Sequence, residues 1–264
     1  MPFRVKFKIA DTTFQFSSPN PKPILWFKRH YRTYICGDDP DLDISLTFGR
    51  RRMGGGSPGN PELISEDGRF FLSTDFFDVK GNYPGGKIDV LANHDMGPAD
   101  LTRTLFAIIA VKRGGFLLHA SAVADGDRSY VFCGPSESGK TTIARLLQEK
   151  DVLTDETTAV VNTGGRYYAY ATPFFGELGK ITKNTGAPIR AVFFIHKGKD
   201  FSHKRIGKAA AMRYFLNDII LRGRNPDLTK KLLDNLYDLA GSVSCYDLYF
   251  KPERELWRYV NGIN

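Results

Sequence analysis

The feature that most constrains this chain is a loop with two glycines, placed between a strand-like and a helix-like segment. Tyr130–Cys133 is an apolar run, and Ile143, Leu146 and Leu147 share one face of a helix. Between them stand Gly134, Pro135, Ser136, Glu137, Ser138, Gly139, Lys140, Thr141 and Thr142. This order fits G-x-x-x-x-G-K-[ST] in the strand–loop–helix context of phosphate-binding loops (P-loops, Walker A). The spacing predicts a site for the phosphates of a nucleotide; the alternative is a degenerate loop that no longer binds.

Each residue type in this loop has a physical reason to be there. Gly134 and Gly139 allow the backbone to turn with its N–H groups toward an anion. The start of the helix adds unpaired N–H groups and the positive end of the helix dipole. Lys140 has the reach for β- and γ-phosphates, and the Thr141 hydroxyl can ligate Mg²⁺. The loop therefore predicts phosphate and metal, but no particular substrate.

Two adjacent carboxylates follow one helix later. Val152–Glu156 is predicted to be a short strand that ends in Asp155 and Glu156. A helix of about ten residues and a returning strand would bring this strand end beside the phosphate loop. One carboxylate could then hold Mg²⁺, and the other could accept the proton of an attacking hydroxyl. The alternative is an exposed pair that caps the next turn.

A histidine precedes the loop on the neighbouring strand. His119 stands in Leu117–Ser121, where alternation places it on the face opposite Leu118. It could therefore point toward a site or toward solvent. A lone histidine in a strand is more often structural than catalytic, so the residue pattern by itself favours the structural role.

The organisation of the chain changes near residue 98. Residues 1–97 are β-rich, with short aromatic segments between Gly, Pro, Asn and Asp clusters, and Phe3–Ile9 alternates as a strand does. Arg50–Pro61 is expected to be a loop because it is rich in Gly and Pro. Beyond it we predict helices from Pro98, after Lys140, over Met212–Ile220 and Leu228–Leu239 and after Pro252, with strands over Phe116–Val123, Tyr130–Cys133, Thr158–Val161, Arg166–Ala171, Ile189–Ile195 and Val243–Phe250. Interleaved strands and helices indicate an α/β fold, and the hairpin turn at Asn162–Gly165 indicates a mixed sheet.

Composition narrows the class of protein. Of 264 residues, 42% are hydrophobic, which excludes a mostly disordered chain. No apolar run approaches the roughly 20 residues that a bilayer span requires. The three cysteines supply neither a disulfide framework nor a zinc site of usual spacing. We therefore expect a soluble cytoplasmic protein, and the net charge of +8 admits an anionic partner without selecting one.

The most basic segment is His196–Lys208, which we expect to be a loop after a strand. It holds a single aromatic residue, Phe201, and no recognised nucleic-acid-binding module. We interpret it as a solvated loop, or as a clamp for phosphates or an acidic peptide. Nucleic acid is thus not an expected partner, although nucleic-acid binding is the alternative function from a different class.

Three segments together resemble the catalytic domain of HPr kinase/phosphorylase and its kinase-like relatives. They are Leu117–Val123 (LLHASAV), Val131–Thr142 (VFCGPSESGKTT) and Val152–Val160 (VLTDETTAV). The loop is also similar to that of ATP-dependent phosphoenolpyruvate (PEP) carboxykinase, which shares the same core. The chain is most similar to HPr-kinase-related proteins from bacterial peptide-modification gene clusters, some of which phosphorylate peptides on serine.

The resemblance covers roughly residues 98–264 and implies a P-loop kinase core of this type that uses ATP and Mg²⁺. The matching residues are Lys140 and Thr141 for ATP and Mg²⁺, Asp155 and Glu156 for the acidic pair, and His119 for the active-site histidine, with Glu177 as a further candidate. The chain departs from the family at Glu137, where glycine is usual, and at Glu156, where the family has aspartate. Which acid is the base and which the metal ligand therefore stays open.

The activity implied by the resemblance is that of an ATP-dependent kinase. It would transfer the γ-phosphoryl group to a hydroxyl, in first place a serine of a peptide or protein, with Asp155 as general base. Residues 1–97 would recognise the acceptor, and a homo-oligomer is compatible with the sequence. The alternatives are an ATP-binding regulatory module without catalysis and a small-molecule kinase.

Overall fold

The computed structural model describes residues 1–49, 62–66, 68–84, 86–179, 184–221 and 225–263. It contains helices and mixed β-sheets, so the predicted mixed α/β class is confirmed. The chain forms two compact units. Unit 1 comprises Met1–Ile109 and Leu221–Lys230, and unit 2 comprises Ala110–Ile220 and Lys231–Asn264. Among the described residues, no helix combines the length and apolar character that crossing a membrane requires.

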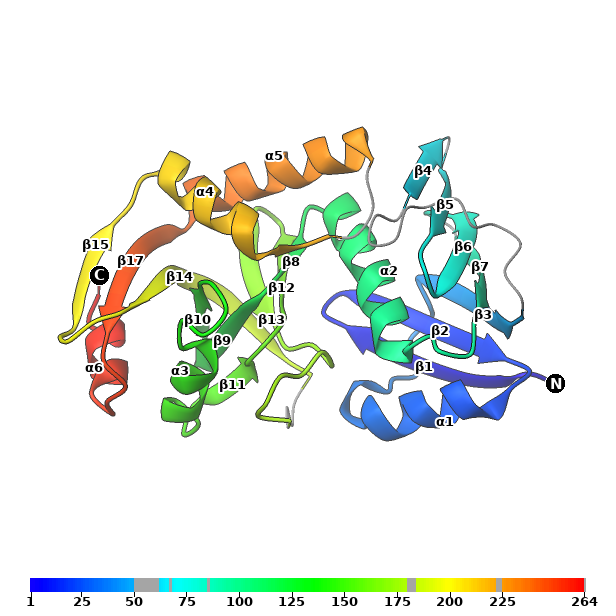
Figure 1. Ribbon diagram of the computed structural model, residues 1–264, viewed down its shortest axis with the longest axis horizontal. Coiled ribbons are helices and arrows are strands. Elements are labelled where there is room, and N and C mark those ends of the chain that lie inside the picture. Colours follow the sequence, from blue (N-terminus) through cyan, green and yellow to red (C-terminus); the bar gives the residue numbers. More distant parts are fainter. Residues whose placement is uncertain (50–61, 67, 85, 180–183, 222–224, 264) are drawn as a thin grey trace. The chain divides into compact units, whose positions relative to one another are not determined.

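Unit 1 is built on a seven-stranded sheet. Its elements are β1 (Phe3–Ile9), β2 (Thr12–Ser18), α1 (Pro21–His30), a 3₁₀ turn (Arg32–Tyr34), β3 (Leu42–Phe48), β4 (Glu62–Glu66), β5 (Arg69–Ser73), β6 (Phe77–Asn82), β7 (Lys87–Ala92) and most of α2 (Pro98–Lys112). The strand order is β1-β2-β3-β7-β6-β5-β4 (Figure 1). The strand predicted at Phe3–Ile9 is confirmed as β1. The loop predicted at Arg50–Pro61 lies outside the described residues.

Helix α1 is not among the elements that the sequence predicts for this unit. Its prolines, Pro21 and Pro23, lie in the first turn, where a missing N–H costs no hydrogen bond. The Asn20 side chain caps the helix by accepting an N–H of that turn. Farther along the helix, Phe27 packs against Phe16 of β2, with ring centroids 4.6 Å apart. The helix is thus held by aromatic packing on β2 that a local reading of the sequence does not show.

Unit 2 contains the remaining elements. They are β8 (Phe116–Leu118), β9 (Ala120–Asp125), β10 (Arg128–Cys133), α3 (Lys140–Leu146), β11 (Asp151–Thr154), β12 (Thr158–Thr163), β13 (Arg166–Tyr170), β14 (Gly186–Lys197), β15 (Ser202–Arg205), α4 (Lys208–Asp218), β16 (Ile219–Ile220), most of α5 (Pro226–Ser242), β17 (Ser244–Phe250) and α6 (Leu256–Asn261). The predicted hairpin is confirmed, because β12 and β13 pair antiparallel around Asn162–Gly165.

The long strand β14 organises the sheet of unit 2. Its first residues pair antiparallel with β13, and the rest pairs in parallel with β10 on one side and β17 on the other. The predicted mixed sheet is therefore confirmed. Because β10, β14 and β17 run in the same direction, their carboxyl ends meet at one edge. The phosphate loop follows β10 at this edge, where ligands bind in open α/β sheets.

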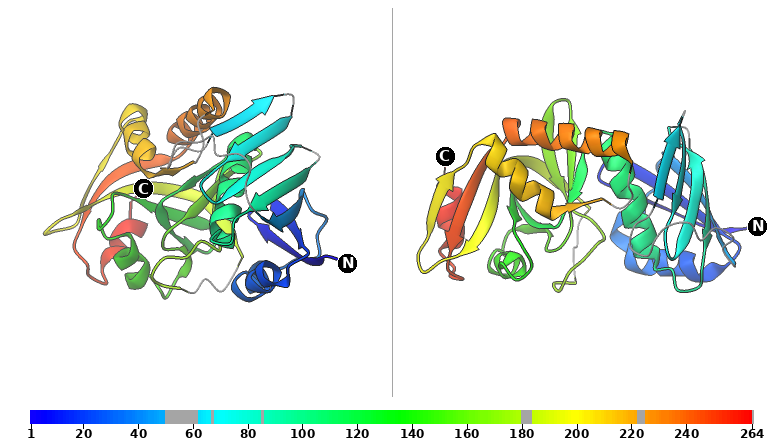
Figure 2. Two further views of the ribbon diagram at one scale, coloured as in Figure 1. Left: turned by 45° about the vertical axis from the view of Figure 1, so that its right-hand side comes forward. Right: turned by 45° about the horizontal axis from the view of Figure 1, so that its top comes forward.

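Helices cover both faces of this part of the sheet (Figures 1 and 2). On one face, Phe132 and Phe193 of the strands share a buried cluster with Ile143 of α3 and Leu256 of α6. On the other face, Phe194 stacks on Tyr214 of α4. The amphipathic stripe that follows Lys140 in the sequence therefore anchors the helix after the phosphate loop in the core.

Three predicted elements differ from the structure. The stripe over Met212–Ile220 is not one helix, because α4 ends at Asp218 and the β-branched pair Ile219–Ile220 forms β16 against β8. Leu216, an apolar residue of this segment, is exposed. The segment His196–Lys208 is not a loop throughout, since β15 pairs antiparallel with β17. The strand predicted over Phe116–Val123 is two strands, β8 and β9, which belong to different parts of the sheet.

Candidate functional site

The phosphate loop depends on its two glycines for different close contacts. Gly139 has φ +111°, and a Cβ there would lie 2.7 Å from Cζ of Phe250. Gly134 has φ +156°, and a Cβ there would lie 2.8 Å from Oγ of Ser138. Within the described part of the chain, that buried Ser138 hydroxyl has no hydrogen-bond partner. An unsatisfied buried hydroxyl in such a loop is what a ligand oxygen would satisfy.

Glu137, the residue at which the loop departs from the family, adopts a positive φ of 62°. This is the left-handed region, which glycine enters freely and other L-residues enter at a cost. The side chain is exposed, so it does not pack to offset that strain. The backbone of the loop therefore keeps the conformation for which glycine is the usual residue, although the side chain differs.

Lys140 is folded back onto its own loop. Its Nζ donates hydrogen bonds to the Gly134 carbonyl at 2.7 Å and the Pro135 carbonyl at 3.0 Å. The residue is 6% exposed. Burial lowers the pKa of the Lys140 ammonium below its usual value, and the charges of Asp218 and Glu156 oppose this shift. The structure thus brings the loop lysine within electrostatic range of two carboxylates.

Asp155 lies just after β11 and is 2% exposed. Its two oxygens accept the backbone N–H groups of Gly176 at 3.0 Å and Leu178 at 2.8 Å. A Cβ on Gly176 would lie 2.8 Å from Oδ2 of Asp155, so only glycine allows this approach. The turn itself is held by the Thr154 hydroxyl, which accepts the N–H of Glu156 at 3.2 Å. Asp155 is therefore rigidly oriented by the chain around it.

The second acid has a different environment. Glu156 places Oε1 3.5 Å from Nδ1 of His119, and both side chains are about one-third exposed. His119 lies at the break between β8 and β9, and its N–H donates to the main-chain carbonyl of Asp218 at 2.7 Å. The strand alternation used to place this histidine does not apply at a break. The structure does, however, bring His119 and Glu156 together.

Asp218, the last residue of α4, joins this group, although the sequence pattern does not predict it as a site residue. Its side chain is almost fully buried, and burial raises the pKa of its carboxyl from 3.8 to about 6. Lys140 and a hydrogen bond from the Gly134 backbone oppose that shift. A polar residue at the end of the apolar stripe was the only signal in the sequence. Asp218 therefore links α4 to the first residue of the phosphate loop and, through its carbonyl, to His119.

Glu177, the further candidate, lies between the two residues whose amides hold Asp155. It forms an ion pair with Arg145 of α3, with Nη2 and Oε2 2.6 Å apart. Both side chains are more than half exposed, so the pair contributes little to stability. It does connect the end of α3 to the segment that orients Asp155.

The acidic and histidine side chains of this group do not gather around one point. In the described residues, no group of three or more His, Cys, Asp or Glu side chains forms a metal cluster. Mg²⁺ in phosphoryl-transfer sites is commonly held by one or two carboxylates together with phosphate oxygens. Thr141, in the first turn of α3, and the acidic pair after β11 carry oxygen atoms of the kind that such a site would use.

Comparison with known proteins adds little to this site. No protein-family model and no curated protein matches the sequence. One solved structure that matches is described as "Structure of the Hpr(Ser) kinase/phosphatase from Coxiella burnetii". The match has a TM-score of 0.25 and 10% sequence identity, and it covers 46% of this chain and 87% of that one. A likeness at this level carries no argument about activity, so we base the function on the residues of the site.

Proposed function

We propose that the chain is an ATP-dependent kinase that transfers the γ-phosphoryl group to a hydroxyl, in first place a serine of a peptide or protein. Residues 98–264 would form a P-loop core of the HPr kinase/PEP carboxykinase type, and residues 1–97 would recognise the acceptor. One observation carries the proposal. In the loop between β10 and α3, Lys140 is held by the carbonyls of Gly134 and Pro135, and the buried Ser138 hydroxyl has no partner among the described residues, which is an arrangement that phosphate oxygens would satisfy.

The loop accounts for nucleotide binding. Its backbone N–H groups and the Ser138 hydroxyl would take phosphate oxygens, and Lys140 would leave the carbonyls of Gly134 and Pro135 to pair with the β- and γ-phosphates. Thr141 and Glu156 would ligate Mg²⁺, which neutralises phosphate charge when it is bound. Lys140 would exchange two neutral carbonyl acceptors for charged phosphate oxygens. Hydrogen bonds between two charged groups are stronger, so ATP binding would favour this movement of the lysine.

Asp155 would act as the general base. The acceptor hydroxyl oxygen forms a bond to the γ-phosphorus while the bond from that phosphorus to the β–γ bridging oxygen breaks. The bridging oxygen leaves with the electron pair as part of ADP, and the hydroxyl proton passes to the Asp155 carboxylate. The amides of Gly176 and Leu178 hold this carboxylate in one orientation, which lowers the entropic part of the barrier. His119 would orient Glu156 through the contact of 3.5 Å.

The test is phosphoryl transfer from γ-labelled ATP to serine-containing peptides. Asp155→Asn retains one side-chain oxygen that can accept a backbone N–H, so the affinity for ATP should not change. The turnover number should fall by a factor of about 10²–10⁴, because the variant has no general base. Glu156→Gln should instead raise the Mg²⁺ concentration that half-saturates the reaction. Lys231→Ala, an exposed lysine of α5, is the control. Turnover at the wild-type rate by Asp155→Asn would show that Asp155 is not the base.

A second function, an ATP-binding module without catalysis, has one observation in its favour. Both oxygens of Asp155 already accept amides and the residue is buried, so no acceptor hydroxyl reaches it in the present conformation. Such a module would bind ATP, lose binding in Lys140→Ala, and phosphorylate no peptide. Transfer to any hydroxyl acceptor that is abolished in Asp155→Asn would exclude this reading.

A further inference from the structure

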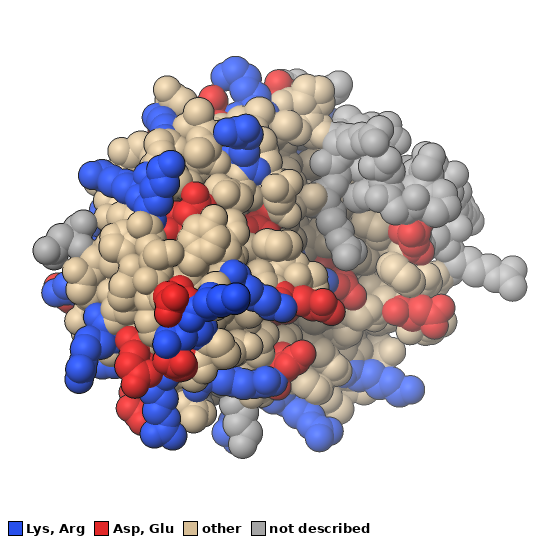
Figure 3. Space-filling model, turned by 60° about the vertical axis from the view of Figure 1, so that its left-hand side comes forward, with Lys and Arg blue, Asp and Glu red and all other residues tan. Residues whose placement is uncertain are grey.

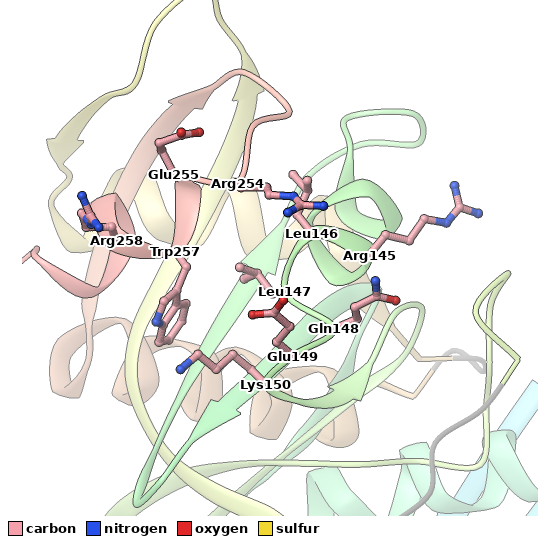
Figure 4. A pocket seen from close by; sticks show the side chains of 10 residues that line it. All are labelled: Arg145, Leu146, Leu147, Gln148, Glu149, Lys150, Arg254, Glu255, Trp257 and Arg258. Carbon is pink, nitrogen blue, oxygen red and sulfur yellow. The ribbon is translucent and has the colours of Figure 1, made fainter.

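A polar pocket lies in unit 2 between the end of α3 and the start of α6 (Figure 4). Its volume is about 530 Å³, which is in the range of pockets that hold ligands. Arg145–Lys150 forms one wall, and Arg254, Glu255, Trp257 and Arg258 form the other. In Figure 4 the side chain of Arg254 reaches from its wall toward Leu146 on the opposite one. The pocket is separate from the phosphate loop, which lies at the other end of α3.

Basic side chains outnumber acidic ones in this pocket. The basic residues are Arg145, Lys150, Arg254 and Arg258, and the acidic ones are Glu149 and Glu255. Lys150 and Arg145 are paired with acids outside the lining, Asp125 and Glu177. Arg254 and Arg258 form no ion pair with any residue that the structure describes. In Figure 4 Arg254 points toward the α3 wall, whereas Arg258 lies beyond Trp257, so each of these two cations would meet its own carboxylate.

The surface around the pocket does not share this excess of basic over acidic side chains. On the face that carries β15, β17 and α6, basic and acidic side chains are interspersed (Figure 3). A polyanion as extended as nucleic acid would meet both signs of charge there. A short acidic segment that enters the pocket would meet mainly the arginines. The charge pattern thus favours a small acidic group over a long anionic polymer.

An aromatic wall stands beside these cations. The Trp257 indole packs edge-on against Tyr130, with ring centroids 5.3 Å apart and an interplanar angle of 88°. The ammonium of Lys150 lies over the same indole, 4.9 Å from its ring centre. The ring is therefore fixed before any ligand arrives. Fixed aromatic surface next to arginine is typical of surfaces that bind peptides, and a bare anion would have no use for it.

Two links join the pocket to the proposed catalytic residues. Helix α3 begins at Lys140 and spans seven residues, so its end, which lines the pocket, lies about 10 Å along the helix axis from the phosphate loop. Arg145 of the pocket wall is bound to Glu177, whose neighbours Gly176 and Leu178 hold Asp155. An extended peptide covers about 10 Å in three residues. A peptide seated in the pocket could therefore present a nearby serine to the site.

We propose that this pocket docks an acidic segment of the phosphoryl acceptor, with separate glutamate or aspartate side chains of the acceptor pairing with Arg254 and with Arg258. The inference rests on the proposed kinase function and adds a substrate class to it. The acidic residue that meets Arg254 stands about three to four positions from the phosphorylated serine, because the end of α3 and the loop are one short helix apart.

The experiment compares two serine peptides that differ only in having glutamate or glutamine at those positions. Arg254→Glu/Arg258→Glu should raise KM for the glutamate peptide about tenfold, since two ion pairs become repulsive contacts, while kcat and the KM for ATP stay unchanged. The matched control is Arg166→Glu/Lys231→Glu, which changes net charge equally at exposed positions outside the pocket. Arg254→Gln/Arg258→Gln is the milder variant should the reversal impair folding, which thermal unfolding reports.

Binding of the fluorescein-labelled glutamate peptide without ATP separates the two ideas. If the wild-type protein binds this peptide and Arg254→Glu/Arg258→Glu does not, the pocket is a docking site. If no peptide is phosphorylated in that case, only the kinase function fails. If the glutamine peptide binds and reacts as well as the glutamate peptide, the docking inference is wrong although the kinase function stands. An equal rise in KM in the control pair would also overturn it.

Discussion

Gly139→Ala is the substitution for which the structure predicts the largest effect in the phosphate loop. A Cβ at this position meets Cζ of Phe250 at 2.7 Å, and φ is +111°. The backbone strain of an L-residue at positive φ is about 1–2 kcal/mol. Overpacking against a buried ring adds about 1–3 kcal/mol, because Phe250 belongs to the core cluster and has little room to move. We expect a loss of about 2–5 kcal/mol in the free energy of unfolding.

Gly164→Ala is the matched control for this substitution. Gly164 also has a positive φ, +60°, but a Cβ there meets nothing within 4 Å. Both substitutions restrict the unfolded chain equally, so that contribution cancels between them. Gly164→Ala should therefore cost about 1–2 kcal/mol from backbone strain alone. The difference between the two variants isolates the contact with Phe250.

The assay is urea unfolding followed by tryptophan fluorescence in a Trp26→Phe background. Trp26 lies in unit 1 and Trp257 in unit 2, so the remaining signal reports the unit that holds the loop. Adding Phe250→Leu removes Cζ, and the double variant should lose at least about 1 kcal/mol less than the sum of the two single losses. Equal losses for Gly139→Ala and Gly164→Ala, or full additivity with Phe250→Leu, would refute the contact.

Three further predictions follow from single residues. Glu137→Gly should stabilise unit 2 by up to about 1 kcal/mol, because it relieves an L-residue at φ 62°, and calorimetry should show tighter ATP binding as a carboxylate leaves the loop. The carboxyl of Asp218 has its pKa raised to about 6, so the folded state holds a proton that the unfolded state releases near pH 3.8. Stability should fall by about 3 kcal/mol as pH rises from about 4 to 6, and Asp218→Asn should flatten that part of a urea-unfolding series against pH. Arg145→Ala should cost less than about 1 kcal/mol in the same urea assay, since its ion pair with Glu177 is exposed, and a larger loss would show that the pair does more than join two surface side chains.

The succession of strand, glycine-containing loop and helix could be predicted from sequence because its information is local. Strand β10, the loop and α3 follow each other without interruption, and each residue type reports its own backbone requirement. The return strand before Asp155 and Glu156 was predictable for a similar reason, since only one helix separates it from the loop. Position along the chain then implies position in space.

Asp218 and the ends of several elements could not be predicted because they depend on distant partners. Periodicity carries the helical stripe through Ile219–Ile220, but pairing with β8 draws these two residues into a strand and leaves Asp218 at the helix end. The same strand, β8, ends just before His119, where the chain passes from pairing with β12 to pairing with β10. The basic segment hides β15 for the same reason, because its partner β17 lies some forty residues later. In each case tertiary pairing outweighs the local pattern.

Asp155 and Glu156 are neighbours in sequence, yet the turn after β11 gives them opposite surroundings. The Thr154 hydroxyl accepts the N–H of Glu156, and this turn directs one carboxylate into the amides of Gly176 and Leu178 and leaves the other beside His119. A buried, fixed carboxylate suits a task that needs one orientation, whereas an exposed one can move with a bound cation. Division of roles by environment is a general way for paired acids to act differently in one site. Asp155→Glu should therefore be poorly tolerated, because one added methylene displaces both amide contacts, whereas Glu156→Asp should retain most phosphoryl transfer; the reverse result would assign the base to Glu156.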